Sequence, residues 1–391
     1  MRLRFFNTYE PVAPLYRDLL PVLADRGHSV EVVIAGRAYR PGEVREDREG
    51  LSFRTVPTPA LGQGRLAKAM THAGYVLGAS TLSGLGRGVD LNVFMTQPPL
   101  FGAWGGALGL TRGQPYACIV MDLYPHVATE AGVLPRRSVL TRGLEALAGR
   151  TLRGARAVIV IGRCMADRMA AMGVDPGRVH VIHNWSDTEA VRPVAVGDNG
   201  LRASLGLQDE FVVMYSGNLG VAHSFEEVLG AAERIGPEAG VSFVFAGEGA
   251  RKREVEAAAR RLPHLRVMGY QPIERLSESL SMGDVHYISL RPGFEGLVVP
   301  SKAYGVFAAG RPVLYQGAAS GEIARVVEEE EVGVVLAPGD TEGLVEAILG
   351  QRDDSAGRAA AGQRARELAV GTYSREAALE RYLEVLVGGA S

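Results

Sequence analysis

Residues 291–315 read RPGFEGLVVPSKAYGVFAAGRPVLY, and this stretch decides the fold. The triplet Pro-Ser-Lys at 300–302 predicts a helix start, because proline fits the first helical turn and a hydroxyl and an ammonium there would face an anion. Small residues then end the helix before a proline-led strand at 311–315. Another strand at 285–290 precedes the stretch, so the order is strand, helix, strand, which is typical of a parallel sheet.

The same alternation extends over the whole chain. Short β-branched or aromatic runs alternate with amphipathic helical stretches, which is the pattern of parallel sheets covered on both faces, so the predicted fold class is α/β. The strands predicted in the first half are 3–6, 30–35, 51–56, 92–95, 117–121, 157–161 and 180–182, with helices at 15–26, 65–85, 138–152 and 164–172. Those predicted in the second half are 211–215, 242–246, 265–268, 285–290, 312–315 and 332–336, with helices between them.

The length of 391 residues predicts two domains, because one hydrophobic core rarely organises so many residues. The periodic pattern stops at 187–198, where prolines, glycine and polar residues predict an interdomain linker. We therefore expect an N-terminal domain at 1–186 and a C-terminal domain at 199–372. Ligands of doubly wound domains bind at the carboxyl ends of the strands, so the loops there carry the functional signals, among them 122–130.

Composition narrows the classes of partner. The 42 basic and 44 acidic residues nearly cancel, so no nucleic-acid surface is expected. Cys118 and Cys164 are expected as buried thiols, because two scattered cysteines form neither a disulfide framework nor a metal site. The start MRLRFF lacks the apolar region of a secretory signal, which predicts a cytoplasmic protein. Two uncharged stretches, 69–86 and 91–111, leave peripheral contact with the inner face of a membrane open.

Two glycine-rich turns follow the first two strands of the predicted C-terminal domain. YSGNLG at 215–220 and AGEGARK at 246–252 each lead from a strand into a helix. Glycines there would let backbone N–H groups approach an anion, and Lys252 at a helix start favours an anion between the two positive groups. A purely structural turn and a solvated lysine fit these patterns equally, so both interpretations stay open.

Taken together, the motifs resemble one family. They are YSGNLG, FAGEGARK, VMGYQP and VPSKAYGVFAAGRPV in the second half, and MTQPPLFG, MDLYPHVATEAGVL and VIHNWSD in the first. In this order they resemble the retaining glycosyltransferases of the GT-B fold, family 4, and among them the bacterial polysaccharide branch that is similar to fucosaminyl and colanic acid transferases. The resemblance implies two Rossmann-like domains facing across a cleft, with a final helix within 373–391 that returns to the first domain.

By this resemblance, the C-terminal domain binds a nucleotide diphosphate sugar, which is the co-substrate, and no cofactor is expected. The implied donor-site residues are Gly217, Asn218, Gly220, Gly247, Gly249, Lys252, Gly269, Tyr270, Arg291, Glu295, Pro300, Ser301 and Lys302. A fixed ammonium at Lys302 would stabilise the charge of the leaving diphosphate. In the N-terminal domain the candidate catalytic residues are His126 and Asp122, and the candidate acceptor contacts are Asn7, Tyr9, Gln97 and Tyr124. A structural alternative for His126 is that it only caps local backbone.

The reaction implied is a metal-independent retaining transfer of a hexosyl or N-acetylhexosaminyl group from a UDP-sugar to an acceptor hydroxyl. No metal site is predicted, because His, Asp and Cys residues do not cluster at the spacing of metal ligands. The acceptor is left open among sugars, lipid-linked sugars and small molecules.

The chain also departs from the family pattern. Many members have two glutamates in this segment, the second of which binds ribose, whereas this chain has Leu297 and Gly305, with Glu295 nearby as a possible substitute. Asn218 and His223 replace the basic pair of the phosphate loop. Two alternatives therefore stay open: a non-catalytic protein that holds a nucleotide sugar or a partner, and an epimerase of nucleotide sugars.

Overall fold

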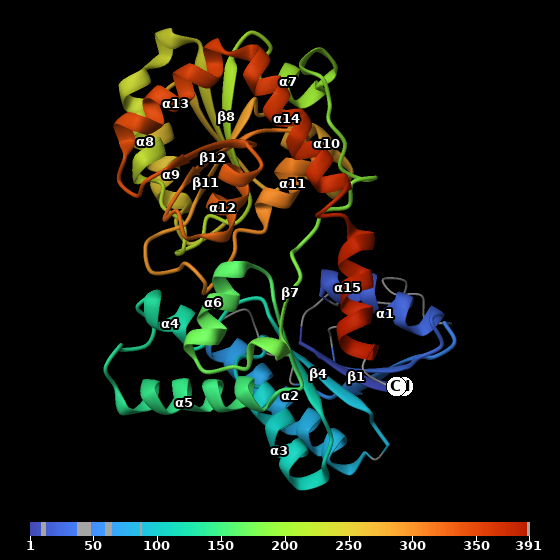
Figure 1. Ribbon diagram of the computed structural model, residues 1–391. Helices are drawn as coiled ribbons and strands as arrows, with labels where there is room; N and C mark the ends of the chain where they lie inside the picture. Colours follow the sequence, from blue (N-terminus) through green and yellow to red (C-terminus); the bar gives the residue numbers. More distant parts are fainter. Residues whose placement is uncertain (9–12, 37–47, 59–64, 87, 389–391) are drawn as a thin grey trace. The chain divides into compact units, whose positions relative to one another are not determined.

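The computed structural model describes residues 1–8, 13–36, 48–58, 65–86 and 88–388. The chain forms two compact units (Figure 1): unit 1 comprises Met1–Ile182 and Leu379–Ser391, and unit 2 comprises His183–Ala378. Each unit is an α/β structure on one parallel sheet. The predicted fold class, α/β with two Rossmann-like domains, is confirmed.

Unit 1 has a seven-stranded parallel sheet with the order β3-β2-β1-β4-β5-β6-β7. Its strands are β1 (Arg2–Asn7), β2 (Ser29–Ala35), β3 (Leu51–Val56), β4 (Leu91–Met95), β5 (Tyr116–Val120), β6 (Ala157–Val160) and β7 (Val179–Val181). Its helices are α1 (Pro14–Asp25), α2 (Arg65–Leu85), α3 (Gly102–Arg112), α4 (His126–Glu130), α5 (Val139–Gly154), α6 (Arg163–Ala171) and most of α15 (Arg375–Val387).

Aromatic side chains form the centre of the unit 1 core. The rings of Phe6 and Phe94 stack 4.4 Å apart, and Phe101 meets Phe94 edge-on at 5.3 Å. Helix α3 packs closely because it carries glycine here: a Cβ on Gly105 would lie 2.7 Å from Phe94 and 2.8 Å from Tyr116. A larger residue at 105 would therefore push α3 away from β4 and from the start of β5.

Unit 2 has a six-stranded parallel sheet with the order β10-β9-β8-β11-β12-β13. Its strands are β8 (Phe211–Ser216), β9 (Val241–Ala246), β10 (Leu265–Met268), β11 (Val285–Ser289), β12 (Val313–Gln316) and β13 (Gly333–Leu336). Its helices are α7 (Gly200–Ser204), α8 (Glu226–Ile235), α9 (Lys252–Ala259), α10 (Leu276–Ser281), α11 (Lys302–Ala308), α12 (Glu322–Glu329), α13 (Thr341–Asp353) and α14 (Ser355–Val370).

The central strand β8 shows why this sheet is covered on both faces. Val213 and Tyr215 belong to the core shared with α8, α9 and α13, whereas Val212 and Met214 alternate with them and pack with Met282 on the other face. The order of strands reverses between β8 and β11. This reversal is the point where doubly wound sheets open a ligand crevice at their carboxyl ends.

All thirteen predicted strands lie within one residue of the observed bounds, and both cysteines are buried thiols as predicted. Two expectations were wrong in detail. The loop expected at 122–130 contains the short helix α4, and α11 begins at Lys302, so Pro300 precedes the helix instead of lying in its first turn. The segment 187–198, which was predicted as an interdomain linker, belongs to unit 2. Ser281 Oγ accepts from Val194 N at 3.0 Å, and other hydrogen bonds also hold the segment to this unit.

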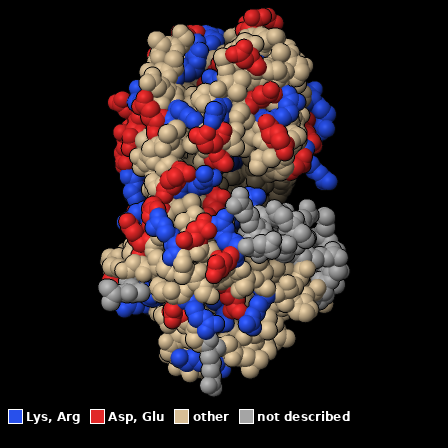
Figure 2. Space-filling view, turned by 90° about the vertical axis from the view of Figure 1, so that its right-hand side faces the viewer, with Lys and Arg blue, Asp and Glu red and all other residues tan. Residues whose placement is uncertain are grey.

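Two surface properties bear on partners. The face drawn in Figure 2 carries acidic and basic side chains interspersed, as the near-zero net charge suggests. Within the described ranges, no helix combines the length and the apolar character needed to cross a bilayer.

Candidate functional site

Unit 2 brings three loops together at the carboxyl ends of β8, β9 and β10. The N–H of Gly217 donates to Ala246 O at 2.9 Å, and that of Leu219 to Glu248 O at 2.8 Å. Gly247 has a φ of +153°, and a Cβ there would lie 1.9 Å from Gly217 O, so only glycine fits. The close approach of the loops is a structural reason for glycine at this position, whatever ligand the loops hold.

Lys302 lies at the first position of α11, next to the loop after β8. Its Nζ donates to the Tyr215 hydroxyl, lies 3.7 Å from the centre of that ring, and lies 3.4 Å from His223 Nε2. No described acidic side chain is within ion-pair distance of this ammonium, and burial lowers the pKa of Lys302 well below its ordinary value. A Cβ on Gly217 would lie 3.3 Å from Lys302 Cε, so the glycine leaves the loop directly against the lysine.

Tyr215 and His223 position this lysine without adding negative charge. The Tyr215 hydroxyl donates to Asn218 O at 2.6 Å, and His223 Nδ1 donates to Ser289 O at 2.6 Å. Burial, and next the Lys302 ammonium, lowers the pKa of His223 to about 3, and burial raises the pKa of Tyr215. Both side chains are therefore neutral at pH 7, so neither of them supplies an anion to balance Lys302.

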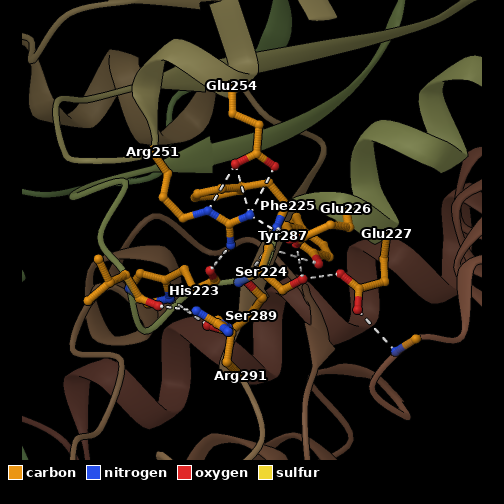
Figure 3. A network of polar contacts seen from close by, with 12 residues as sticks. His223, Ser224, Phe225, Glu226, Glu227, Arg251, Glu254, Tyr287, Ser289 and Arg291 are labelled. Atoms are coloured by element: carbon orange, nitrogen blue, oxygen red, sulfur yellow. Dashed lines mark hydrogen bonds and ion pairs between the residues drawn. The ribbon is translucent and has the colours of Figure 1, made fainter. Parts of the chain in front are cut away.

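An arginine network fixes the backbone around His223 (Figure 3). Arg251 Nη1 donates to His223 O at 2.5 Å, Nη2 to Glu226 Oε1 at 2.6 Å, and Nε to Glu254 Oε2 at 2.9 Å. The guanidinium also lies 5.3 Å from the centre of the Phe225 ring. These contacts tie the start of α8 to the start of α9 beside the loop that follows β8.

Two predicted donor residues lie on the loop after β11. Arg291 Nη1 donates to Val221 O at 3.2 Å and lines a cavity of about 160 Å³ together with Ser224 and Glu227. Glu295 Oε2 accepts from Gly293 N at 2.8 Å, while its Oε1 is buried and has no hydrogen-bond partner among the described residues. A buried acceptor of this kind is costly unless a ligand or water satisfies it.

The remaining predicted donor residues differ in their surroundings. Gly220, Gly249 and Gly269 belong to the three converging loops, Asn218 and Ser301 are exposed, Pro300 is buried, and Tyr270 has 58% of its surface exposed. Lys252 is already paired, with its Nζ 2.6 Å from Glu248 Oε1. Gly305 faces Leu280, whose Cδ1 would lie 3.3 Å from a Cβ on that glycine.

In unit 1, Asp122 and Tyr124 line a cavity of about 60 Å³ at the carboxyl ends of β4 and β5. Thr96 connects the two strand ends, because its Oγ1 accepts from Met121 N at 2.9 Å and donates to Ile119 O at 3.2 Å. Burial raises the pKa of Asp122 to about 6. A carboxyl group that titrates near neutrality in a mostly apolar cavity is a candidate for proton transfer or for binding a polar substrate group.

The other predicted residues of unit 1 lie in different settings. His126 is the first residue of α4, burial lowers its pKa, and its Nδ1 has no hydrogen-bond partner in the described part of the chain. Asn7 is buried, and its Oδ1 accepts from Ala13 N at 3.2 Å, which fixes the start of α1. Gln97 is partly exposed and precedes the cis peptide to Pro98. Tyr9 lies outside the described residues.

Both units match families of known proteins. Residues 13–185 match the family model "Glycosyl transferase 4-like domain", and residues 210–354 match "Glycosyl transferases group 1". The chain belongs to the GT-B glycosyltransferases. The first matched segment lies almost entirely in unit 1, and the second lies in unit 2.

Individual relatives agree with this family assignment. WbjE of Pseudomonas aeruginosa, named a probable glycosyltransferase, is 30% identical over 261 residues, which cover 66% of this chain and 65% of WbjE. WcaI of Escherichia coli (strain K12), named for colanic acid biosynthesis, is 29% identical over 240 residues, which cover 59% of this chain and 57% of WcaI. The matches thus span less than two thirds of these relatives.

A solved structure gives the same fold. HepE of Anabaena, crystallised in complex with UDP, matches 99% of this chain and 100% of its own length with a TM-score of 0.75 and 16% identity.

In this GT-B glycosyltransferase, the sequence did not predict a role in the site for four residues: Thr96, Tyr215, His223 and Arg251. His223 had been noted only because Asn218 and His223 replace the basic pair of the family's phosphate loop. The sequence does contain a signal that draws attention to Lys302, namely the rarity of lysine. Only three of the 42 basic residues are lysines, at 68, 252 and 302.

Proposed function

We propose that the chain transfers a hexosyl or N-acetylhexosaminyl group from a UDP-sugar to an acceptor hydroxyl, with retention of configuration and without a metal ion. The observation that carries this proposal is the ammonium of Lys302, which is partly buried beside Gly217 with no described acidic partner. A diphosphate suits such a group, because its oxygens accept charge-assisted hydrogen bonds and neutralise the ammonium.

The same lysine would act on the leaving group. When the bond between the anomeric carbon and the diphosphate oxygen breaks, that oxygen gains negative charge, and a fixed ammonium stabilises it most in the transition state. The acceptor hydroxyl attacks the anomeric carbon on the face that the diphosphate leaves, through an oxocarbenium-like transition state. Its proton passes to the departing phosphate oxygen, so no enzyme nucleophile is needed.

UDP is the proposed nucleotide because HepE, which shares the fold, was crystallised with UDP and with UDP-glucose. The loop at Gly269 and Tyr270 would hold the base, and the exposed Tyr270 ring is free to cover it. Gly305 offers no carboxylate for the ribose. We therefore assign Glu295 to a hydroxyl of the ribose or sugar, since its buried Oε1 has no described partner.

In the N-terminal unit, we assign Asp122 to the acceptor side of the reaction. With a pKa near 6, its carboxyl group is ionised at pH 7 and can accept a hydrogen bond from an acceptor hydroxyl. His126 would serve as a neutral polar group near the reacting sugar, because burial lowers its pKa.

Product analysis tests the reaction. The chain is incubated with UDP-sugars and candidate acceptors in the presence of EDTA, and the products are examined by NMR. We expect release of UDP together with a glycoside that keeps the donor's anomeric configuration. A glycoside of inverted configuration would contradict retention, and loss of activity in EDTA that is restored by a divalent cation would contradict the metal-free proposal.

The same experiment separates the two alternatives. An isomerised nucleotide sugar formed without acceptor would identify an epimerase. A rise in melting temperature with UDP but no turnover with any acceptor would favour the non-catalytic interpretation. A ligand at a hundredfold excess over its dissociation constant adds about 2.7 kcal/mol to stability, so UDP-, GDP- and dTDP-sugars can be compared by thermal unfolding.

A further inference from the structure

Unit 1 has a second cavity, at the edge of its sheet that lies opposite Asp122. This cavity of about 450 Å³ is bordered by the residues at which β5, β6 and β7 begin. Cavities that bind small organic molecules measure about 300 to 1,000 Å³, so this one has room for a molecule the size of a sugar. The cavities described above at the carboxyl ends of the strands measure only about 60 and 160 Å³.

Two arginines line this cavity from neighbouring strands. Arg156 directly precedes β6, and Arg178 directly precedes β7. The two strands are parallel and pair Val158 with Val179, so both arginines lie at the same edge of the sheet. The backbone N–H of Arg156 donates to Tyr116 O at 2.8 Å, which joins this edge to the start of β5.

Little negative charge balances the two arginines. Arg156 has no acidic partner among the described residues, and none of the described residues that line the cavity is acidic. Arg178 Nη1 donates to Ala155 O at 3.5 Å, and its Nε lies 3.6 Å from Asp175 Oδ2 in an exposed ion pair. Exposed pairs of this kind contribute little to stability, so an arriving anion can take the place of the carboxylate.

Glycines leave room beside the arginines. Gly109 on α3, Gly113 and Gly154 all line the cavity. A Cβ on Gly154 would lie 2.7 Å from the Tyr116 hydroxyl oxygen, so a side chain there would displace the tyrosine. A Cβ on Gly109 would have only ordinary contacts, 3.5 Å from Gln114 O and 3.7 Å from the Tyr116 ring. Position 109 can therefore accept a side chain, which would take up space in the cavity.

We propose that this cavity, which we call the amino-edge site, binds a phosphate monoester of a sugar-sized molecule. Guanidinium groups bind phosphate oxygens through paired N–H groups, and the charges of Arg156 and Arg178 match the two charges of a monoester. The remaining volume beside the glycines would hold the organic part of the ligand. Because β5 separates this site from Asp122, the bound molecule would not be the acceptor that reacts there. The proposal is independent of the sugar transfer proposed above.

Titration calorimetry on the full chain tests the amino-edge site, with inorganic phosphate, glucose 6-phosphate and glucose as probes. We expect both phosphates to bind and glucose not to bind. Arg156→Ala/Arg178→Ala should weaken the binding of both phosphates at least tenfold. Arg17→Ala/Arg142→Ala is the matched control, because it removes two exposed arginines elsewhere in unit 1 and should bind as the unmodified chain does.

A substitution that keeps both arginines tests the volume of the cavity. Gly109→Leu should weaken the binding of glucose 6-phosphate at least tenfold and leave that of inorganic phosphate unchanged, because the leucine takes the space of the sugar and not that of the phosphate. Equal affinity of Gly109→Leu and the unmodified chain for glucose 6-phosphate would overturn the assignment of the ligand to this cavity.

Melting temperatures without ligand serve as the folding control. If the alanine pair is destabilised, Arg156→Lys/Arg178→Lys replaces it, since it keeps both charges without the paired N–H groups and should still weaken binding severalfold. Failure of both phosphates to bind would overturn the proposal. So would binding that is lost in Lys302→Met but kept in the variants of Arg156 and Arg178, because the anion would then occupy the donor site. An equal loss in Arg17→Ala/Arg142→Ala would show unspecific attraction and would also overturn it.

Discussion

Replacement of Lys302 by methionine is expected to change binding and stability in opposite directions. Methionine keeps the length and most of the apolar stem of lysine but removes the charge. In the ligand-free protein the ammonium is desolvated without a described acidic partner, which lowers its pKa and disfavours the folded state. The variant without ligand should therefore be at least as stable as the unmodified chain.

Nucleotide binding should weaken in the same variant. Loss of one partner of a largely buried charged hydrogen bond costs about 2–4 kcal/mol, and every 1.4 kcal/mol is a factor of ten, so the dissociation constant of UDP should rise roughly 30- to 700-fold. Titration calorimetry gives this constant, and thermal unfolding without ligand gives the stability. Arg261→Met provides the control, because it removes a positive charge from an exposed surface ion pair with Glu233.

Two outcomes would refute this reasoning. Unchanged affinity for UDP in Lys302→Met would mean that the diphosphate does not meet the lysine. A large loss of stability without ligand, comparable to that of a truncated core residue, would mean that the contacts of the lysine with Tyr215 and His223 are a structural element and not an unfilled anion site.

Three further predictions concern single residues. In the folded protein the carboxyl of Asp122 has a pKa of about 6, above its value in the unfolded chain, so the protein loses stability as the pH rises from about 4 to 6. Asp122→Asn should therefore raise the melting temperature at pH 7.5 but not at pH 3.5. If the variant and the unmodified chain differ by the same amount at both pH values, the charge of Asp122 is not buried. The pKa of His223 is about 3, below its value in the unfolded chain, so its contribution to stability is present above about pH 6.5 and is lost as the pH falls toward 3. In His223→Gln, the stability measured by unfolding should therefore depend less on pH in this acid range. If stability falls with pH equally in the variant and in the unmodified chain, His223 does not cause the loss. Gly247→Ala should lower the free energy of unfolding, measured with denaturant, by more than about 2 kcal/mol, because the new Cβ would lie 1.9 Å from Gly217 O. Gly350→Ala on α13 should be neutral or stabilising, because the space around its Cβ is open. Equal effects of the two substitutions would contradict the loop geometry.

Much of the fold was predictable because its signals are local. Runs such as FVVMYS in β8 and VSFVFA in β9 are β-branched or aromatic and fully apolar over most of their length, which is what a strand buried on both faces requires. Helix α4 has only five residues, and so short a segment shows no helical period.

The site was only partly predictable, since its contacts join distant parts of the chain. Lys302 and Tyr215 are 87 positions apart, and no local pattern shows that the phenol meets the ammonium. Thr96 likewise acts on the residues after β5, which are 25 positions away. For Gly247, sequence alone could not separate close backbone approach from ligand contact, because both require the absence of a side chain.

The desolvated ammonium of Lys302 has a consequence for the energetics of recognition. While the site is empty, burial lowers the pKa of Lys302, and an arriving diphosphate would raise it. The pKa of this lysine should therefore rise when nucleotide binds, and the affinity for nucleotide should fall once the pH exceeds the pKa that Lys302 has in the empty site. In this way the chain would couple occupancy of its donor site to the acidity of its surroundings through one nitrogen atom.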